Sequence, residues 1–383
     1  AFKAYAISSF FNSTHDTNRL RTTMSKYQGF RRPERIDEMI STVKRYGGRP
    51  PLVDPDPIHI SKVGKLIDRS VSPQEGGQGI FAWLKNADMK LGVKIYKPSS
   101  IESVYRIQRA NRIKNALEAI RQLNYKGTKA FLLFNTLNIP RQHIVDSSNA
   151  LAGLLLPAAP SSCYIRQNIS GKNQLKCVTL GDVISFRNII PSCSEYDYDP
   201  LPPQAKWSLL DSLSQAIASL HHVGLIHADI SSNNVFIRWP NSSDPKAYVI
   251  DAFNGFGVDG GNEEVGYMHS DVYCPTSLRA RQYTPATDVY CLGWWIAHIG
   301  VARNPEVQRM DRPSLQEIRT ASGVFYRRHE YVLDALKQNR DGLPVWLYDV
   351  VSSALEVNPD YRPTSRELTY AVHDYWLNFG DTR

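Results

Sequence analysis

Three side chains that could handle a metal ion and a phosphate lie close together in the sequence. Asp229 follows a helix-like segment, and Asn234 comes five residues later, just before the strand-like run 235–237. A second strand-like run, 248–250, ends at Asp251. Asp and Asn are common turn formers, but two carboxylates and an amide on one hairpin match what Mg²⁺-dependent phosphoryl transfer requires. One carboxylate would position an attacking hydroxyl, and the other would hold the metal ion together with the amide.

Two features upstream could add contacts to a phosphate. Lys94 lies in the middle of the apolar run 91–96, and a buried ammonium group must be paired or functional. A position on an edge strand, facing water, is the alternative for Lys94. Gly76, Gly77 and Gly79 form a turn between strand-like runs, where backbone N–H groups can approach a phosphate without a side chain in the way. Such turns also occur without any ligand.

The elements that must position these groups change character along the chain. The first part is rich in strand-like runs, and the remainder is mostly helical. An amphipathic pattern with helical period runs over 207–223, and a capping box at 99–102 opens a helix that extends to about Leu123. The other expected strands are 80–84, 91–96, 143–145 and 152–156, and the other expected helices are 34–46, 286–300, 314–322, 345–355 and 365–378.

Composition and charge exclude several classes of protein. The 383 residues are 42% hydrophobic and 21% charged, which excludes wholesale disorder, and no apolar run reaches the ~18 residues of a membrane-spanning helix. Of the net charge of +8, residues 1–49 carry +6 (ten Lys or Arg against four Asp or Glu). That tract could meet nucleic acid, though only as an accessory property. Five widely spaced cysteines without a CxxC pair favour a reducing compartment, and we expect a cytoplasmic protein.

These stretches, in this order, resemble the motifs of the protein kinase superfamily. The run from His227 through Asp229 to Asn234 resembles its catalytic loop, and the run 251–253 resembles its metal-binding Asp-Phe-Gly motif. The run 76–81 resembles the glycine-rich loop, and Val93-Lys94 resembles the end of the strand that bears the phosphate-contacting lysine.

Later stretches extend the resemblance over roughly residues 58–378. The run 284–293 resembles the helix after the activation segment, where Asp288 would brace the catalytic loop, and the run 358–364 resembles the late Arg-Pro motif around Arg362. The Lys-Ile-Tyr-Lys-Pro stretch that begins at Lys94 resembles a divergent bacterial branch more than the familiar eukaryotic kinases.

The resemblance implies an α+β, bilobal protein-kinase-like fold with a small β-rich N-lobe and a larger helical C-lobe. It divides the chain into a basic N-terminal extension (1–57), the N-lobe (58–157) and the C-lobe (158–383). The implied activity is transfer of the γ-phosphate of ATP, with Mg²⁺, to Ser or Thr hydroxyls of a protein substrate.

The resemblance also assigns a role to each site residue. Lys94 would orient the α- and β-phosphates, Asn234 and Asp251 would bind Mg²⁺, and Asp229 would accept the proton of the hydroxyl. Glu118 is the helix carboxylate that we expect to pair with Lys94. The remaining ATP contacts are Gly76, Gly77 and Gly79 at the phosphates, Leu156 at the back of the pocket, Pro157 and Ala158 in the hinge, and Phe81 and Phe236 as apolar covers above and below the adenine.

Several positions depart from the superfamily pattern. Gln74 replaces the first glycine of the loop. Ala228 replaces the arginine that usually binds a phosphorylated activation loop, so activation by phosphorylation is not expected. Thr276 stands where a Glu would normally pair with Arg362. Arg362 therefore needs another partner or lies exposed.

Three other functions compete with this interpretation. A pseudokinase scaffold would bind nucleotide or a partner protein without catalysis. A small-molecule kinase of the aminoglycoside or choline type shares the H-x-D-x-x-x-x-N loop, but the runs 284–293 and 358–364 argue against it. A nucleic-acid-binding protein is suggested only by the basic tract. Because Lys94, Asp229, Asn234 and Asp251 are all present, the sequence favours an active enzyme.

Overall fold

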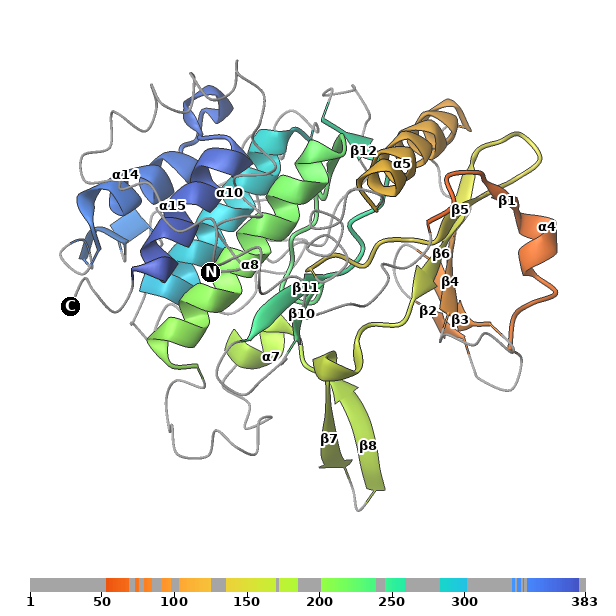
Figure 1. Ribbon diagram of the computed structural model, residues 1–383, viewed down its shortest axis with the longest axis horizontal. Helices are drawn as coiled ribbons and strands as arrows, with labels where there is room; N and C mark the ends of the chain where they lie inside the picture. The colour runs from red at the N-terminus through yellow and green to blue at the C-terminus, as the bar shows by residue number, and fades with distance from the viewer. Residues whose placement is uncertain are drawn as a thin grey trace, which may run out of the picture.

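The computed structural model has a small sheet-containing lobe and a larger helical lobe (Figure 1). This is the α+β, bilobal arrangement that the sequence predicts. Residues 1–52 of the predicted N-terminal extension, with the predicted helix 34–46, and the predicted helix 314–322 lie outside the part of the chain that the structure describes. The structure describes residues 53–68, 73–75, 79–84, 91–97, 103–124, 136–169, 172–184, 201–238, 245–258, 283–301, 333–334, 336–338, 340 and 343–378.

The small lobe is built on one six-stranded sheet. Its strands pair antiparallel, except that β1 runs parallel to β5. Across the sheet the order is β1 (Ile58–His59), β5 (Gln142–Val145), β6 (Leu151–Pro157), β4 (Leu91–Tyr96), β3 (Gly79–Trp83) and β2 (Gln74–Glu75). The four strands predicted from apolar alternation are thus present, and they lie next to one another as β5, β6, β4 and β3.

The two faces of this sheet have different partners. Alternation along β3, β4 and β6 puts Phe81, Lys94 and Leu154 on one face, since Phe81 is opposite Lys94 and Lys94 is opposite Leu154. Phe81 and Leu154 pack with the main core of the molecule. The other face carries a separate small core of Val63, Ala82, Val93, Ile144 and Ala152, which includes a residue of helix α4 (Ile60–Val63). Lys94 therefore points toward the large lobe.

One long helix connects the sheet with the large lobe. Helix α5 (Ser103–Asn124) contacts β5 and β6 of the small lobe and the strands β9 (Leu225–Ile226) and β12 (Phe256–Gly257) of the large lobe. Its buried residues, among them Ile113, Leu117 and Ile120, belong to the main core. Helix α5 therefore packs against both lobes.

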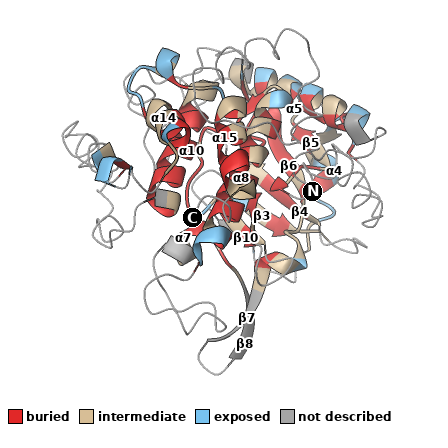
Figure 2. Cartoon of the chain, turned by 60° about the vertical axis from the view of Figure 1, so that its left-hand side comes forward, coloured by how far each residue is buried: buried red, intermediate tan, exposed pale blue. Residues whose placement is uncertain are grey.

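The large lobe is organised around helix α8. Figure 2 shows the buried stretches of the helices gathered in the interior of this lobe. Helix α8 packs against α15 (Ser365–Leu377), α10 (Pro285–Trp295) and the strand β11 (Lys246–Val249). Its apolar residues recur at helical spacing, as the sequence predicts, and Leu209, Leu213, Ile217 and Leu220 are buried. The helices are α7 (Leu180–Ile184), α8 (Pro203–His222), α10 (Pro285–Trp295), the π-helical turn η3 (Ile296–Val301), α14 (Val345–Ala354), the 3-10 turn η5 (Pro359–Tyr361) and α15 (Ser365–Leu377).

Three short two-stranded sheets complete the described part of the large lobe. The pair β7 and β8 stands off the body as a ribbon just after the connection from the small lobe, and the sequence did not predict it (Figure 1). The other two pairs lie next to the motif residues. The strands are β7 (Tyr164–Ile169) with β8 (Lys172–Cys177), preceded by the 3-10 turn η1 (Ser161–Cys163), β9 (Leu225–Ile226) with β12 (Phe256–Gly257), and β10 (Val235–Arg238) with β11 (Lys246–Val249).

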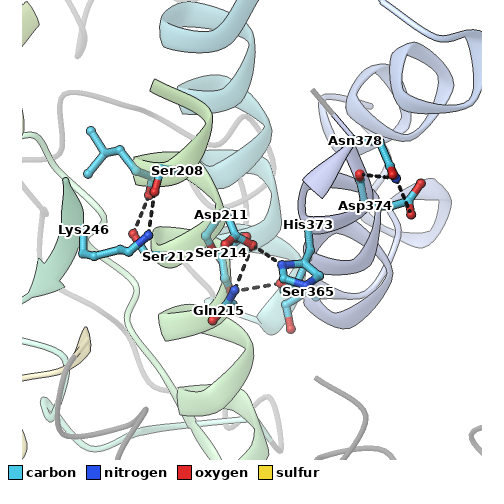
Figure 3. A network of polar contacts seen from close by, with 12 residues as sticks. Ser208, Asp211, Ser212, Ser214, Gln215, Lys246, Ser365, His373, Asp374 and Asn378 are labelled. Atoms are coloured by element: carbon cyan, nitrogen blue, oxygen red, sulfur yellow. Dashed lines mark hydrogen bonds and ion pairs between the residues drawn. The ribbon is translucent and has the colours of Figure 1, made fainter. Parts of the chain in front are cut away.

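A polar network ties α8 to α15 inside the large lobe (Figure 3). Asp211 Oδ1 accepts hydrogen bonds from His373 Nδ1 (2.9 Å) and Gln215 Nε2 (2.8 Å). Asp211 and His373 are both buried. Because a buried carboxylate needs partners to offset its lost hydration, this network fixes how the two helices pack.

The buried carboxylate of Asp374 gives a testable effect of pH on stability. Burial raises the pKa of Asp374 from its ordinary value of about 4 to about 6, so the fold loses stability as the pH rises from about 4 to about 6, and the loss stays constant above that range. We expect Asp374→Asn to be more stable than the wild type at pH 7.5 by about 1–3 kcal/mol, measured by urea unfolding. The difference should shrink as the pH falls toward 4.5, because the carboxyl group then becomes protonated in the unfolded chain as well as in the fold.

A gain that is the same at both pH values would contradict this cause. Asp360→Asn, at an exposed carboxylate, is the matched control and should change stability little at either pH.

Candidate active site

The hairpin of β10 and β11 brings two motif residues together. Asn234 directly precedes β10, and Asp251 follows β11 by two residues. Because the strands pair in register from Val235 with Val249, the two side chains start from the same end of the hairpin. The backbone N–H of Ile250 donates to the carbonyl of Asn234 at 2.9 Å, which holds this end closed. The sequence pattern of a shared hairpin is therefore realised in the structure.

Asn234 also holds the loop that carries Asp229. Its Nδ2 donates both to Asp229 Oδ2 and to the Asp229 backbone carbonyl, each at 2.9 Å. With the amide nitrogen engaged in this way, the amide oxygen is the atom that Asn234 can offer to a ligand. Asn234 is thus in contact with Asp229 and starts from the same end of the hairpin as Asp251.

Lys94 reaches Asp251 from the small lobe. Its Nζ forms an ion pair with Asp251 Oδ2 at 2.9 Å, and the Lys94 and Asp251 side chains are 11% and 32% exposed. The alternative in which Lys94 faces water from an edge strand is therefore wrong, because β4 is flanked by β3 and β6 and its lysine face is directed inward. The ion pair joins the two lobes at the site.

The backbone of the catalytic-loop motif is held by a carboxylate from α10. Asp288 is fully buried and accepts hydrogen bonds from the N–H groups of His227 (2.7 Å) and Ala228 (2.8 Å). His221 Nε2 donates to the same carboxylate at 2.9 Å. Ala228 has φ +64°, a left-handed conformation that is unfavourable for residues with a Cβ. Asp288 stabilises this conformation, and the predicted bracing role is confirmed.

Two further side chains fix the same loop. His227 is fully buried, and its Nε2 donates to the Ile250 carbonyl at 2.9 Å while its Nδ1 accepts from the Asp229 N–H at 3.2 Å. Trp295 Nε1 donates to the Ile230 carbonyl at 2.9 Å. Both ring nitrogens of His227 are therefore used in structural hydrogen bonds, as expected for a packing residue rather than a proton shuttle.

Replacing Asp288 with asparagine should destabilise the fold strongly. An amide can accept with only one oxygen, and its NH₂ group would face one of the three donors. We expect a loss of about 2–4 kcal/mol in the free energy of unfolding, measured by urea denaturation, with Asp360→Asn as the exposed control. A loss below 1 kcal/mol would show that the loop does not depend on this carboxylate.

Comparisons with known proteins agree with these motifs. No family model matches the chain. It is 24% identical over 207 residues to a calcium/calmodulin-dependent serine/threonine-protein kinase of Malus domestica, a match that covers 50% of this chain and 46% of that protein. It is 26% identical over 193 residues to a probable serine/threonine-protein kinase, gdt2, of Dictyostelium discoideum, a match that covers 45% of this chain and 10% of that protein. The chain is related to the protein kinase superfamily.

Only part of each curated relative is matched, less than half of its length in both cases. Among solved structures, the Mycobacterium tuberculosis PknI kinase domain aligns with 14% sequence identity and a TM-score of 0.45, and the alignment covers 78% of this chain and 92% of that one.

Two of the predicted ATP contacts lie on the sheet face that carries Lys94. Phe81 is directly opposite Lys94, and its ring lies against Gly92, where an added Cβ would come 2.1 Å from it. Leu156 is opposite Gly92 on the same face. The others are Gly79 at the start of β3, Pro157 at the end of β6, Ala158 in the connection that follows, and the half-buried Phe236, which is opposite Tyr248 in the β10–β11 hairpin. Gly76 and Gly77 lie outside the described residues.

The structure corrects the prediction that Glu118 pairs with Lys94. Among the described residues, Lys94 forms its ion pair with Asp251. The part of α5 that reaches the Asp251 segment is near Arg109, whose guanidinium lies 4.2 Å from the centroid of the Phe256 ring. Glu118 is nine residues further on, or about 14 Å along the helix axis. It therefore lies too far along α5, and sequence reasoning gave Arg109 no role.

Arg362 finds partners other than the expected glutamate. It is buried and donates to the backbone carbonyls of Glu356 (2.7 Å), Ala286 (2.8 Å) and Val357 (3.1 Å). Its guanidinium also lies over the ring of Tyr290, 5.0 Å from the centroid. Arg362 thus joins the start of α10 to the segment after α14, which is the first of the two expected outcomes, another partner rather than exposure.

Proposed function

We propose that the chain is an ATP-dependent protein kinase that transfers the γ-phosphate to Ser or Thr hydroxyls of a protein substrate. The observation that supports this most is a pair of contacts that links the four proposed site residues two by two. Lys94 of the small lobe pairs with Asp251, and Asn234 of the same hairpin bonds to Asp229. The sequence similarity to serine/threonine-protein kinases supports phosphate transfer as the class of reaction.

Lys94 supplies the positive charge for the phosphates. An ammonium group that is only 11% exposed interacts strongly with an anion because little water screens it. In the structure its partner is Asp251. When ATP binds, Lys94 would turn to the α- and β-phosphates, while its aliphatic stem stays on the sheet face opposite Phe81.

Asp229 orients the acceptor hydroxyl. Asn234 holds one of its carboxylate oxygens and its carbonyl, and Asp288 holds the two residues before it through their N–H groups. A carboxylate fixed in this way can accept a hydrogen bond from an incoming hydroxyl and take its proton as the oxygen bonds to phosphorus. The leaving group is the β-phosphate oxygen of ADP.

The oxygen donors of Asn234 and Asp251 suit a magnesium ion. The amide oxygen of Asn234 and the carboxylate of Asp251 start from one end of the hairpin. Among the described residues, no group of three His, Cys, Asp or Glu side chains converges, which fits an ion that takes its remaining ligands from phosphates and water. Bound Mg²⁺ would neutralise charge on the phosphates.

Partners and location follow from the same proposal. The acceptor is a protein, and contact with nucleic acid through residues 1–49 would be accessory. In the part of the chain that the structure describes, no helix has both the length and the apolar character needed to cross a membrane. We place the activity in the cytoplasm because the cysteines show no paired pattern in the sequence. The likeness to a bacterial branch stays a prediction.

A nucleotide-binding scaffold without turnover is the second candidate. The observation that favours it is that Lys94 has Asp251, and no carboxylate of α5, as its ion-pair partner among the described residues. A lysine that remains bound to Asp251 would leave the phosphates poorly oriented.

The molecule that receives the phosphate distinguishes a protein kinase, a small-molecule kinase and a scaffold without turnover. The purified chain is incubated with ATP and Mg²⁺, with a generic basic protein in one sample and with choline or an aminoglycoside in others, and the products are analysed by mass spectrometry. We expect phosphoserine or phosphothreonine on the chain or the added protein. Phosphate on a small molecule only would replace the proposal by a small-molecule kinase, and no product would favour the scaffold.

A further inference from the structure

Tyr96 lies at the point where the small lobe meets the segment after Asp251. It is the last residue of β4, two positions after Lys94, so its side chain leaves the same face of the sheet. Its hydroxyl donates to Asn254 Oδ1 at 3.3 Å, and its ring centroid is 5.3 Å from Lys94 Nζ. Tyr96 therefore touches both partners of the ion pair, Lys94 directly and Asp251 through Asn254.

Asn254 closes a tight turn on Asp251. It is buried, and its Nδ2 donates to the Asp251 backbone carbonyl at 2.6 Å. Asp251 has φ +58°, a left-handed conformation that costs a non-glycine residue free energy and persists only where the surroundings hold it. The amide of Asn254 is such a restraint. Its own orientation is set in turn by the Tyr96 hydroxyl.

The burial and charge around Tyr96 keep its hydroxyl a donor. Burial, and then the carboxylate of Asp251, raise the pKa of Tyr96 above its ordinary value, while Arg109 acts in the opposite direction. The phenol therefore stays neutral throughout the physiological range, and its proton remains available for Asn254.

Helix α5 holds the other side of the same segment. The guanidinium of Arg109 lies over Phe256, and Gly255, with φ +79°, is so close that an added Cβ would come 2.6 Å from the Cβ of Arg109. The Asp251–Phe256 segment thus lies between β4 and α5 and contacts both. On the β4 side, Tyr96 donates the hydrogen bond to Asn254.

We propose that Tyr96 is a positioning residue for Asp251: through Asn254, its hydroxyl holds the Asp251 carboxylate in the orientation that binds Mg²⁺. This inference rests on the proposed function, because it takes Asp251 as a metal ligand. It assigns the positioning of Asp251 to the strand that bears Lys94.

The test compares Tyr96→Phe with the wild type. The variant keeps the ring and its packing and loses only the hydroxyl. Without nucleotide, we expect amide hydrogen exchange over residues 251–257 to rise by about three- to tenfold, the change expected for the loss of one neutral hydrogen bond. The thermal shift produced by ATP should also need more Mg²⁺: the Mg²⁺ concentration that gives half of the maximal shift should rise by the same three- to tenfold. Tyr361→Phe, at a residue that is 70% exposed, is the matched control and should change neither.

Two results would overturn the inference. Unchanged exchange over 251–257 would show that the hydroxyl does not hold the segment. Faster exchange with an unchanged Mg²⁺ requirement would reduce Tyr96 to a structural residue. Asn254→Ala should produce the same two changes, and the double variant should add little to either single one. A wild type without any Mg²⁺-dependent ATP binding would instead refute the proposed function, and the exchange measurement alone would then decide whether Tyr96 holds the segment.

Discussion

Phosphate transfer should fall by at least about 100-fold when Asp229 is replaced by asparagine. The side chain keeps its size, and its remaining oxygen can still accept from Asn234 Nδ2, which bonds to Asp229 Oδ2 at 2.9 Å in the wild type. What is lost is the negative charge that takes the proton of the attacking hydroxyl, a contribution of about 10²–10⁴ in rate. The measurement is the initial rate of label transfer from ATP at saturating Mg²⁺.

Binding of nucleotide separates this effect from unfolding. Asp229→Asn should retain an ATP-dependent thermal shift close to that of the wild type, because the phosphates are held by other groups. Transfer within a few-fold of the wild-type rate would show that Asp229 does not orient the hydroxyl. The exposed Asp360→Asn should transfer phosphate at the wild-type rate.

Asp251→Asn should remove the Mg²⁺ dependence of ATP binding. A neutral amide is a weaker ligand for Mg²⁺ than a carboxylate, and Lys94, which is 11% exposed, would lose its counter-charge at 2.9 Å. We expect the thermal shift produced by ATP to become the same with Mg²⁺ and with EDTA, and transfer to fall by at least about 100-fold. In the wild type, Mg²⁺ should enlarge the shift.

If Asp251→Asn still showed a larger ATP-dependent thermal shift with Mg²⁺ than with EDTA, the metal would be bound by other residues. Lys94→Met provides the complementary result, since it removes the phosphate contact and leaves both proposed metal ligands in place. It should weaken ATP binding with and without Mg²⁺ alike.

The sequence predicted the strongly patterned elements well. The apolar run 91–96 is strand β4 with the same limits, and the amphipathic pattern 207–223 is helix α8, which begins four residues earlier at Pro203. In both, the spacing of buried residues follows from the geometry of the element itself. The ribbon of β7 and β8 was not predicted, because its sequence is polar and interrupted, and the backbone pairing that forms it leaves no hydrophobic pattern.

The sequence predicted the parts of the site whose residues are close together in the chain. It did not predict the contacts that depend on how distant helices and strands pack. Asp229, Asn234 and Asp251 come together because one loop and one hairpin carry them. The prediction that Glu118 pairs with Lys94 is wrong because the register of α5 against the sheet is set by side-chain packing over its whole length. The same packing brings Arg109 to Phe256. The link from Tyr96 to Asn254 spans 158 residues, and no local pattern indicates it.

Transfer of labelled γ-phosphate from ATP by the wild-type chain tests the central claim most directly. The chain is incubated with a generic basic protein, with Mg²⁺ or with EDTA, beside Asp229→Asn and Asp251→Asn. We expect label on protein that requires Mg²⁺ and is lost in both variants. Absence of label from the wild type, or label that persists in both variants, would contradict the proposal that Lys94, Asp229, Asn234 and Asp251 form one phosphotransfer site.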